Sequence, residues 1–185
     1  MSWSDRRVRP RAALSGVIGL SLLGAASLTS GCTVGPLYGN AYSPTSTVAQ
    51  VAKIAIEPVS TRQAQEVRNH LIYMFSGGKG RPADPAYRMD LVVSSFSSAA
   101  AIIQSGTTEQ SPTSSLLNMS ASYTVRDTTT GEVVATGRRQ VASAYDVPLQ
   151  EFAALRALRG AEDRAARELA EQVRLAVAQQ VAQRG

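Results

Sequence analysis

The sequence predicts an α+β protein: a two-layer sandwich in the order β-α-β-β-β-α, whose four-stranded mixed sheet carries two helices on one face. Three observations lead to this prediction. Apolar and polar residues alternate in four segments, as in half-buried strands, and two further segments repeat apolar residues every three or four positions, as in amphipathic helices. Both helices need an apolar surface to cover, and the strands supply one. The 185 residues suit a single folded domain.

The N-terminal segment has the composition of a secretory signal peptide. Residues 1–11 are rich in arginine, and residues 12–28, AALSGVIGLSLLGAASL, are apolar or small. A charged region followed by a short apolar stretch and small residues is typical of a leader that is removed after export. We therefore expect residues 1–31 to be cleaved; a retained membrane anchor is the alternative.

The only cysteine, Cys32, directly follows this leader. The preceding residues 28–31, Leu-Thr-Ser-Gly, resemble the lipobox of bacterial lipoproteins, although the leucine lies one position further from the cysteine than usual. This resemblance implies that Cys32 is acylated with fatty chains such as palmitate. Thr33 follows it rather than Asp, which by resemblance to enterobacterial sorting favours the periplasmic side of the outer membrane. The alternative for Cys32 is a small buried residue.

The mature chain divides into a tether and one domain. Residues 32–50 are predicted to form the lipidated N-terminus and a flexible tether, because they are rich in Gly, Pro, Ser and Thr. Residues 51–185 are predicted to form a single α/β domain, which begins with a strand at 51–57. A helix then starts at Ser60 as N-cap, with Gln63 reaching back to it.

The rest of the domain is predicted as three strands and a long helix. Strands are expected at 87–103, 116–126 and 132–145, separated by a polar loop at 104–115 and a hairpin turn at 127–131. The last helix is expected at 149–182, where Gly160 introduces a bend or a break. Its apolar stripe is predicted to contain Phe152, Leu155 or Leu158, Ala161, Ala165, Leu169, Val173 and Ala176.

If both helices cover one face of the sheet, the other face is polar and mildly basic. It could line a hydrated lumen or meet phosphorylated headgroups, because arginine matches phosphate geometry. An ordinary solvated face is an equally good interpretation. The residues expected on this face are Arg88, Ser94, Asn118, Ser120, Ser122, Thr124, Arg126, Thr136, Arg138 and Gln140.

Composition argues against several classes of function. The net charge of +5 falls to +2 without residues 1–31, which hold four of the 19 basic and one of the 14 acidic residues. No basic stripe remains, so nucleic acid is not an expected partner. One Cys and one His, His70, exclude a disulfide and a Cys/His zinc site. No catalytic triad motif or phosphate loop is present, so neither an enzyme nor a cofactor is expected.

Several short motifs, taken in order, resemble the lipopolysaccharide-assembly family LptE in its alphaproteobacterial form. The run 32–39, Cys-Thr-Val-Gly-Pro-Leu-Tyr-Gly, is similar to the mature N-terminus of that family. Further similarities are Arg62-Gln63 with Arg68-Asn69-His70-Leu71, Tyr87-Arg88-Met89-Asp90-Leu91, Ala121-Ser122-Tyr123-Thr124-Val125-Arg126-Asp127 with Thr130-Gly131, and Tyr145 with Phe152-Ala153.

The resemblance implies a non-enzymatic lipoprotein of the outer membrane. In this family the protein acts with the β-barrel LptD as plug and assembly partner, and binds lipopolysaccharide on its way to the outer leaflet. The expected lipopolysaccharide-binding residues are Arg126, Arg138 and Arg139, the basic cluster around one hairpin. The alternatives are an accessory lipoprotein of a lipid-transport ABC system and a lipoprotein with an enzymatic role.

Overall fold

The computed structural model describes residues 46–102 and 112–184, which form a mixed α+β fold. Its order is α-β-α-β-β-β-α, so the predicted architecture is confirmed with one short helix added in front. The elements are α2 (Thr47–Val51), β1 (Ile54–Ile56), α3 (Arg62–Ser76), β2 (Tyr87–Ile102), β3 (Pro112–Asp127), β4 (Val133–Asp146) and α4 (Glu151–Ala182).

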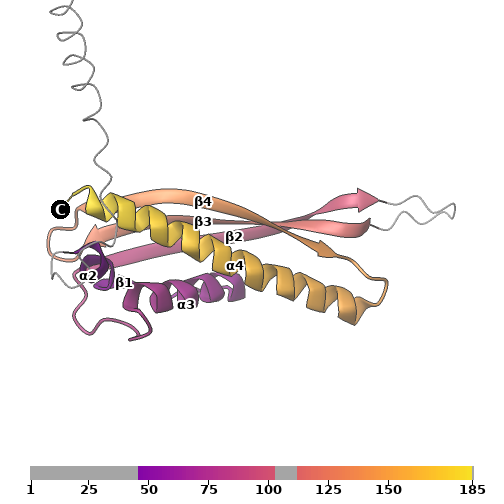
Figure 1. The fold of residues 1–185 in the computed structure, drawn as a ribbon, viewed down its shortest axis with the longest axis horizontal. Coiled ribbons are helices and arrows are strands. Elements are labelled where there is room, and N and C mark those ends of the chain that lie inside the picture. Colours follow the sequence, from indigo (N-terminus) through magenta and orange to yellow (C-terminus); the bar gives the residue numbers. More distant parts are fainter. Residues whose placement is uncertain (1–45, 103–111, 185) are drawn as a thin grey trace, which may run out of the picture. The chain divides into compact units, whose positions relative to one another are not determined.

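The sheet follows the order of the sequence, β1-β2-β3-β4. β1 pairs parallel with the first residues of β2, and the other pairs are antiparallel. β2 and β3 are long, and β2 continues well past the end of β1 (Figure 1). β2 is therefore flanked by strands on both sides only over its first residues. Beyond them it has β3 on one side and no strand on the other.

Both long helices lie on one face of the sheet (Figure 1). Every second residue of the central strand β3, from Ser115 to Val125, is buried beneath them. The alternation of apolar and polar residues in the sequence therefore matches the covered and uncovered faces of the strand. The core consists of aliphatic residues and methionine. Its largest fully buried side chains are Ile56, Val67, Leu71, Met89, Leu117, Met119, Val125, Leu169, Val173 and Val177.

Helix α3 begins one residue later than the sequence predicted. The N-cap is Thr61, whose hydroxyl accepts the backbone N–H of Ala64 at 3.3 Å, so the prediction of Ser60 was wrong. Gln63 does not reach back to a cap. Its side-chain amide donates instead to Glu162 of α4 at 2.8 Å, a partner that no local pattern could reveal.

Ion pairs connect the start of α3 to α4. Arg62 donates to the carboxylates of Glu162 and Asp163, each at 2.8 Å. The hydrogen bond to Asp163 raises the pKa of Arg62 above its usual value, and the nearby acidic charges add to the effect. Because Arg62 and Asp163 are about half exposed, the pair fixes the approach of the two helices more than it stabilises the fold.

Two strand boundaries differ from those expected. β1 is limited to Ile54–Ile56, because Arg68 of α3 donates to the carbonyls of Ile56 and Glu57 at the point where the chain turns away. β3 starts at Pro112, inside the segment predicted as a loop, because residues 112–115 continue the pairing with β2 and β4.

Helix α4 runs without interruption through Gly160. Its apolar stripe begins later than predicted: Phe152 is 84% and Leu155 46% exposed, because the first turns of α4 diverge from the strands that would cover them (Figure 1). From Ala161 onwards the prediction holds. Small residues dominate the buried face, which contains Ala161, Ala165, Ala166, Leu169, Ala170, Val173, Ala176, Val177, Ala178 and Val181.

Candidate binding face of the sheet

The face of the sheet opposite the helices is left uncovered by the described residues, and we call it the open face. As predicted, it is lined by hydroxyl and amide side chains with a few arginines. It also contains two exposed apolar residues of β2, Val92 and Phe96, that the sequence analysis overlooked. Each lies two positions from Ser94, so the alternation along the strand already assigned them to the same face. The open face comprises Arg88, Asp90, Val92, Ser94, Phe96, Asn118, Ser120, Ser122, Thr124, Arg126, Thr136, Arg138 and Gln140.

Hydroxyl groups pair across the strands at the middle of this face. The hydroxyls of Ser94 and Ser120, which lie opposite each other, are 3.0 Å apart, and Arg138 donates to Ser120 at 3.1 Å. Thr136 donates to the carbonyl of Tyr123 at 3.1 Å. These hydrogen bonds hold the guanidinium of Arg138 against the sheet, so its remaining N–H groups are preorganised for an incoming acceptor.

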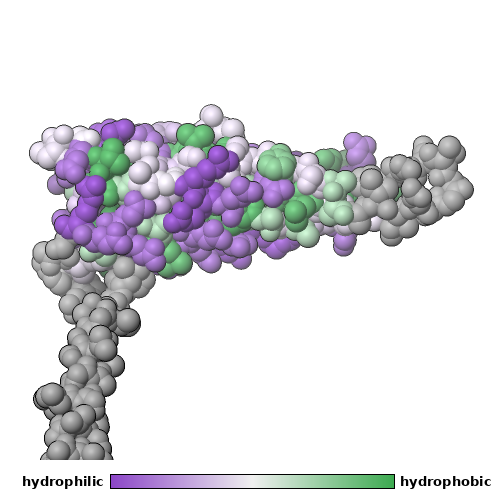
Figure 2. Space-filling model, turned by 90° about the horizontal axis from the view of Figure 1, so that it is seen from above, coloured by the Kyte–Doolittle hydropathy of each residue, from purple (hydrophilic) through white to green (hydrophobic). Residues whose placement is uncertain are grey.

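Positive charge gathers toward one end of the open face. Arg88 and Arg126 face each other across β2 and β3, an unfavourable pairing of like charges. Arg88 is offset by Glu57 at 3.3 Å, whereas Arg126 has no ion pair or hydrogen bond within residues 46–102 and 112–184. The surface is most hydrophilic toward the end that carries the C-terminus and paler toward the far ends of β2 and β3 (Figure 2).

The register separates the three arginines that the sequence grouped together. Arg138 lies opposite Ser122, and with Arg126 it belongs to the open face. Arg139 lies opposite the buried Ala121, so its side chain leaves the sheet on the helix side, and it donates to the carbonyl of Arg138 at 2.8 Å. The three residues share a hairpin but not one surface, because consecutive strand residues point to opposite faces.

The β3–β4 hairpin that carries Arg126 is held by Asp127. Its carboxylate accepts the backbone N–H groups of Thr129 and Thr130 at 2.8 and 2.9 Å, and Gly131 supplies the positive φ of 73° that the turn requires. These hydrogen bonds, first that from Thr130, lower the pKa of Asp127 below its usual value.

We expect the stabilising effect of the Asp127 charge to depend on pH. Because its pKa is lower in the folded chain, its contribution is complete above the ordinary pKa of an aspartate and is lost as the pH falls through the folded value. Urea midpoints of wild type and Asp127→Asn should therefore differ at neutral pH and converge in acid. A difference that stays constant down to pH ~2 would contradict this interpretation.

Other kinds of site find little support in the described part of the chain. Residues 46–102 and 112–184 contain no group of three His, Cys, Asp or Glu side chains that could hold a metal ion. None of the helices in these ranges is both long and apolar enough to cross a membrane. The predicted leader, the lipidation at Cys32 and most of the tether lie outside the described residues, and they stay predictions.

Together, the one-sided helical cover and the polar, basic open face define a small α+β domain whose sheet has one helix-covered face and one uncovered face. The family model "LptE: Lipopolysaccharide-assembly" matches residues 50–177. The chain therefore belongs to the LptE family, and its role is in lipopolysaccharide assembly. No individual curated protein matches the chain by sequence.

A solved structure shares the fold. A protein described as a lipoprotein from Caulobacter crescentus CB15 superimposes with a TM-score of 0.60 at 23% identity, covering 76% of this chain and 98% of that one. A minor lipoprotein from Acinetobacter baumannii gives 0.49 at 17% identity, with 71% and 91% covered. The rare lipoprotein B from Shewanella oneidensis gives 0.49 at 13% identity, with 70% and 92% covered.

Proposed function

We propose that this protein is an outer-membrane lipoprotein, anchored through Cys32 on the periplasmic side, that acts with the β-barrel LptD in delivering lipopolysaccharide to the outer leaflet. In this proposal the domain is the plug and assembly partner of the barrel, and it has no catalytic role. Membership of the LptE family supports the proposal. The observation that carries it is the open face, a long polar sheet surface left bare by both helices.

The chemistry of the open face suits a plug in a hydrated lumen. Its hydroxyl and amide groups can exchange hydrogen bonds with water or with polar side chains of a barrel wall at little cost, whereas an apolar face would demand a dry partner. Arg126 and Arg138 add donors that match the geometry of phosphate groups, such as those of a phosphorylated headgroup. The open face therefore serves both the barrel and the lipopolysaccharide in this proposal.

Affinity purification from detergent-solubilised outer membrane tests the partnership. We expect the tagged full-length chain to bring down LptD in stoichiometric amount, identified by mass spectrometry. Recovery of inner-membrane transporter subunits without a barrel would instead favour an accessory lipoprotein of a lipid-transport ABC system, and would overturn the proposal.

Neutralising Arg126, Arg138 and Arg139 together tests the binding of lipopolysaccharide. We expect the triple glutamine variant to bind purified lipopolysaccharide at fixed salt more weakly, by about 1 kcal/mol for each exposed charge-assisted hydrogen bond that the substitutions remove. The matched control replaces three exposed arginines of α4, namely Arg156, Arg159 and Arg167, by glutamine, which removes the same net charge from the helix layer.

The outcome separates local binding from general charge. Equal loss of affinity in both triple variants would show that only the net charge matters. Undiminished binding in the variant of Arg126, Arg138 and Arg139 would show that these arginines are not part of the binding surface. Single variants then separate the two faces. If the open face is the binding surface, Arg126→Gln and Arg138→Gln carry the loss of affinity and Arg139→Gln, on the helix side, changes little.

A further inference from the structure

The edge of β2 is open over most of its length. β1 covers only Tyr87–Met89: the N–H of Tyr87 donates to the carbonyl of Lys53 at 3.3 Å, and the carbonyl of Met89 accepts the N–H of Glu57 at 2.9 Å. The N–H and C=O groups of every second strand residue point the same way. Those of the odd-numbered residues from Leu91 to Ala99 therefore face the side where β1 has ended, and no described residue is hydrogen-bonded to them.

The opposite edge of the sheet, on β4, is bonded by side chains at three of its backbone groups. The N–H of Thr136 donates to the side-chain oxygen of Gln180 at 2.9 Å, and the carbonyl of Arg138 accepts from Arg139 at 2.8 Å. Nearer the end of β4, Arg164 donates to the carbonyl of Ala144 at 3.1 Å. Proteins commonly block exposed edges in this way, so that no foreign strand can pair with them. The two edges of this sheet are therefore treated differently.

The sequence of the open edge carries none of the usual deterrents to pairing. Residues 91–102, LVVSSFSSAAAI, contain no charged residue and no proline. Charges, prolines and irregular pairing are the means by which edge strands avoid association. Both register shifts in the β2–β3 pairing lie beyond Ala99, so the stretch 91–99 is regular. At about 3.3 Å per residue it offers roughly 27 Å of unpaired backbone.

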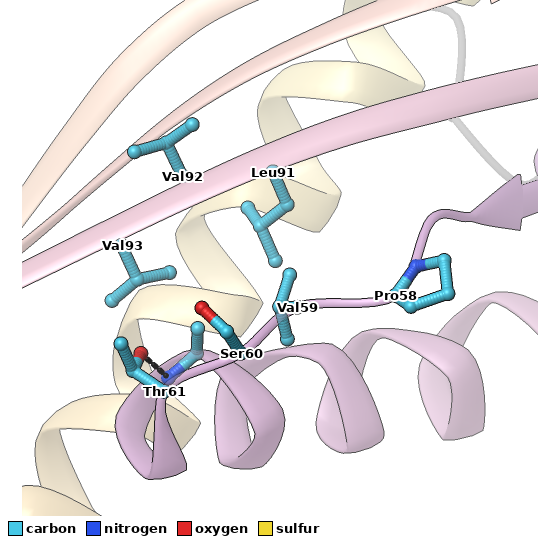
Figure 3. Close-up of a pocket in the computed structure, with 8 residues that line it drawn as sticks. Pro58, Val59, Ser60, Thr61, Leu91, Val92 and Val93 are labelled. Carbon is cyan, nitrogen blue, oxygen red and sulfur yellow. Dashed lines mark hydrogen bonds between the residues drawn. The ribbon is translucent and has the colours of Figure 1, made fainter.

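A groove lined by both aliphatic and hydroxyl side chains runs beside the start of this edge (Figure 3). Its volume is about 520 Å³, and it lies between β2 and the segment 58–61 that leads into α3. Leu91 and Val93 project from β2 toward that segment, where Val59 meets them, while Val92 points to the other face (Figure 3). A chain lying along the start of the β2 edge would therefore place in the groove the alternate side chains that lie beside Leu91 and Val93.

We infer that the edge of β2 from Leu91 to Ala99 takes up an extended segment of another polypeptide by strand addition, with alternate apolar side chains of that segment in the groove. A row of N–H and C=O groups at strand spacing is complementary to another extended backbone and to no lipid or nucleotide. The inference rests on the proposed function for the source of the segment, which is the barrel partner expected to co-purify with the chain.

Two other occupants fit the edge less well. The tether of this chain contains Gly35, Pro36, Gly39 and Pro44, a composition that pairs poorly in a sheet. A second copy would offer its own β2, which has 16 residues and is longer than the open edge. If the two β2 strands paired antiparallel about the middle of that edge, the residues in excess would meet Glu57 and Pro58, where β1 ends. A short segment of a partner avoids both difficulties.

Proline substitution tests the edge without disturbing the fold. Ser95→Pro removes one N–H from the open edge and leaves the pairing with β3 intact, because the N–H of Ser95 points away from β3. We expect the full-length variant to retain its circular dichroism and melting curve but to hold the co-purified barrel roughly tenfold more weakly. Ala142→Pro, which removes an outward N–H from the edge of β4 at a residue outside the set that forms the open face, is the matched control and should retain the barrel.

Amide hydrogen exchange provides an independent readout that needs no mutation. In the complex, exchange should slow at the odd-numbered residues Val93, Ser95 and Ser97, while the even-numbered amides between them, already bonded to β3, change little. Uniform slowing of both sets would indicate binding to a face of the sheet and would overturn the inference. So would equal loss of barrel in the two proline variants, or no loss in either.

The remaining outcomes assign the edge to another occupant or end both proposals. A purified chain that is a dimer and becomes a monomer with Ser95→Pro assigns the edge to a second copy. Odd-numbered amides that are protected in the free lipoprotein, and exposed when residues 33–45 are deleted, assign it to the tether. Failure of the wild-type chain to retain a barrel overturns both proposals, whereas a barrel retained equally by wild type and Ser95→Pro overturns only the strand addition.

Discussion

A purified Cys32→Ala variant, separated from any barrel partner, is expected to stay entirely in the aqueous phase instead of partitioning into detergent. A single acyl chain binds a membrane only reversibly, at about 0.8 kcal/mol per buried CH₂, but several chains on one cysteine make attachment effectively permanent. Residues 46–102 and 112–184 contain no helix able to replace such an anchor. The wild-type chain should therefore partition into detergent and carry the mass of residues 32–185 plus acyl groups.

The experiment must keep export separate from lipidation. The variant is best expressed behind a leader that the general signal peptidase removes, so that an uncleaved apolar leader does not itself hold the chain in the membrane. A matched chain with Cys32 behind its own leader serves as the control. Native protein whose Cys32 thiol is free and unmodified would refute lipidation, and with it the anchored form of the proposed function.

Gly137→Ala is expected to destabilise the fold by about 1–3 kcal/mol, the usual cost of an overpacked site. A Cβ atom on Gly137 would lie 2.8 Å from the hydroxyl oxygen and 3.0 Å from Cζ of Tyr123, which faces it across β3 and β4. Tyr123 is 2% exposed, and its hydroxyl accepts a hydrogen bond from Gln180 of α4 at 3.1 Å. The ring therefore cannot move without disturbing the contact between α4 and the edge of β4.

The same substitution at Gly160 is the matched control and should have the opposite sign. A Cβ atom there meets only the flexible end of Arg164 at 3.5 Å, and alanine is favoured over glycine inside a helix by up to ~1 kcal/mol. Urea denaturation of both variants gives the comparison. Combining Gly137→Ala with Tyr123→Leu should remove most of the added cost, and full additivity would show that the two residues do not interact.

The periodic patterns predicted the parts of the fold that depend on burial alone. Alternation along β2 and β3 assigned residues to the correct faces, because one face of each strand is covered by helices and the other is not. The stripe from Ala161 to Ala176 identified the buried side of α4 for the same reason. The open face could thus be predicted almost completely before any register was known.

Contacts between distant segments could not be predicted from the sequence. Gln63 was assigned to a local cap, but it bonds Glu162, about a hundred positions away. Arg139 was grouped with Arg138 because the two are adjacent, although adjacency in a strand means opposite faces. The short β1 depends on Arg68 capping its last carbonyls, and the exposure of Phe152 depends on how far the start of α4 diverges from the sheet (Figure 1). None of these follows from a local pattern.

The covering of β4 by Gln180, Arg139 and Arg164 limits how this protein can misassemble. Growth of a fibre requires each added molecule to present a fresh template after it has docked. Where Gln180, Arg139 and Arg164 occupy backbone groups of β4, an incoming strand cannot pair with this edge without first displacing them. A molecule that has docked through β2 therefore offers a poorer template on its other side, and these side chains discourage the growth of a longer assembly.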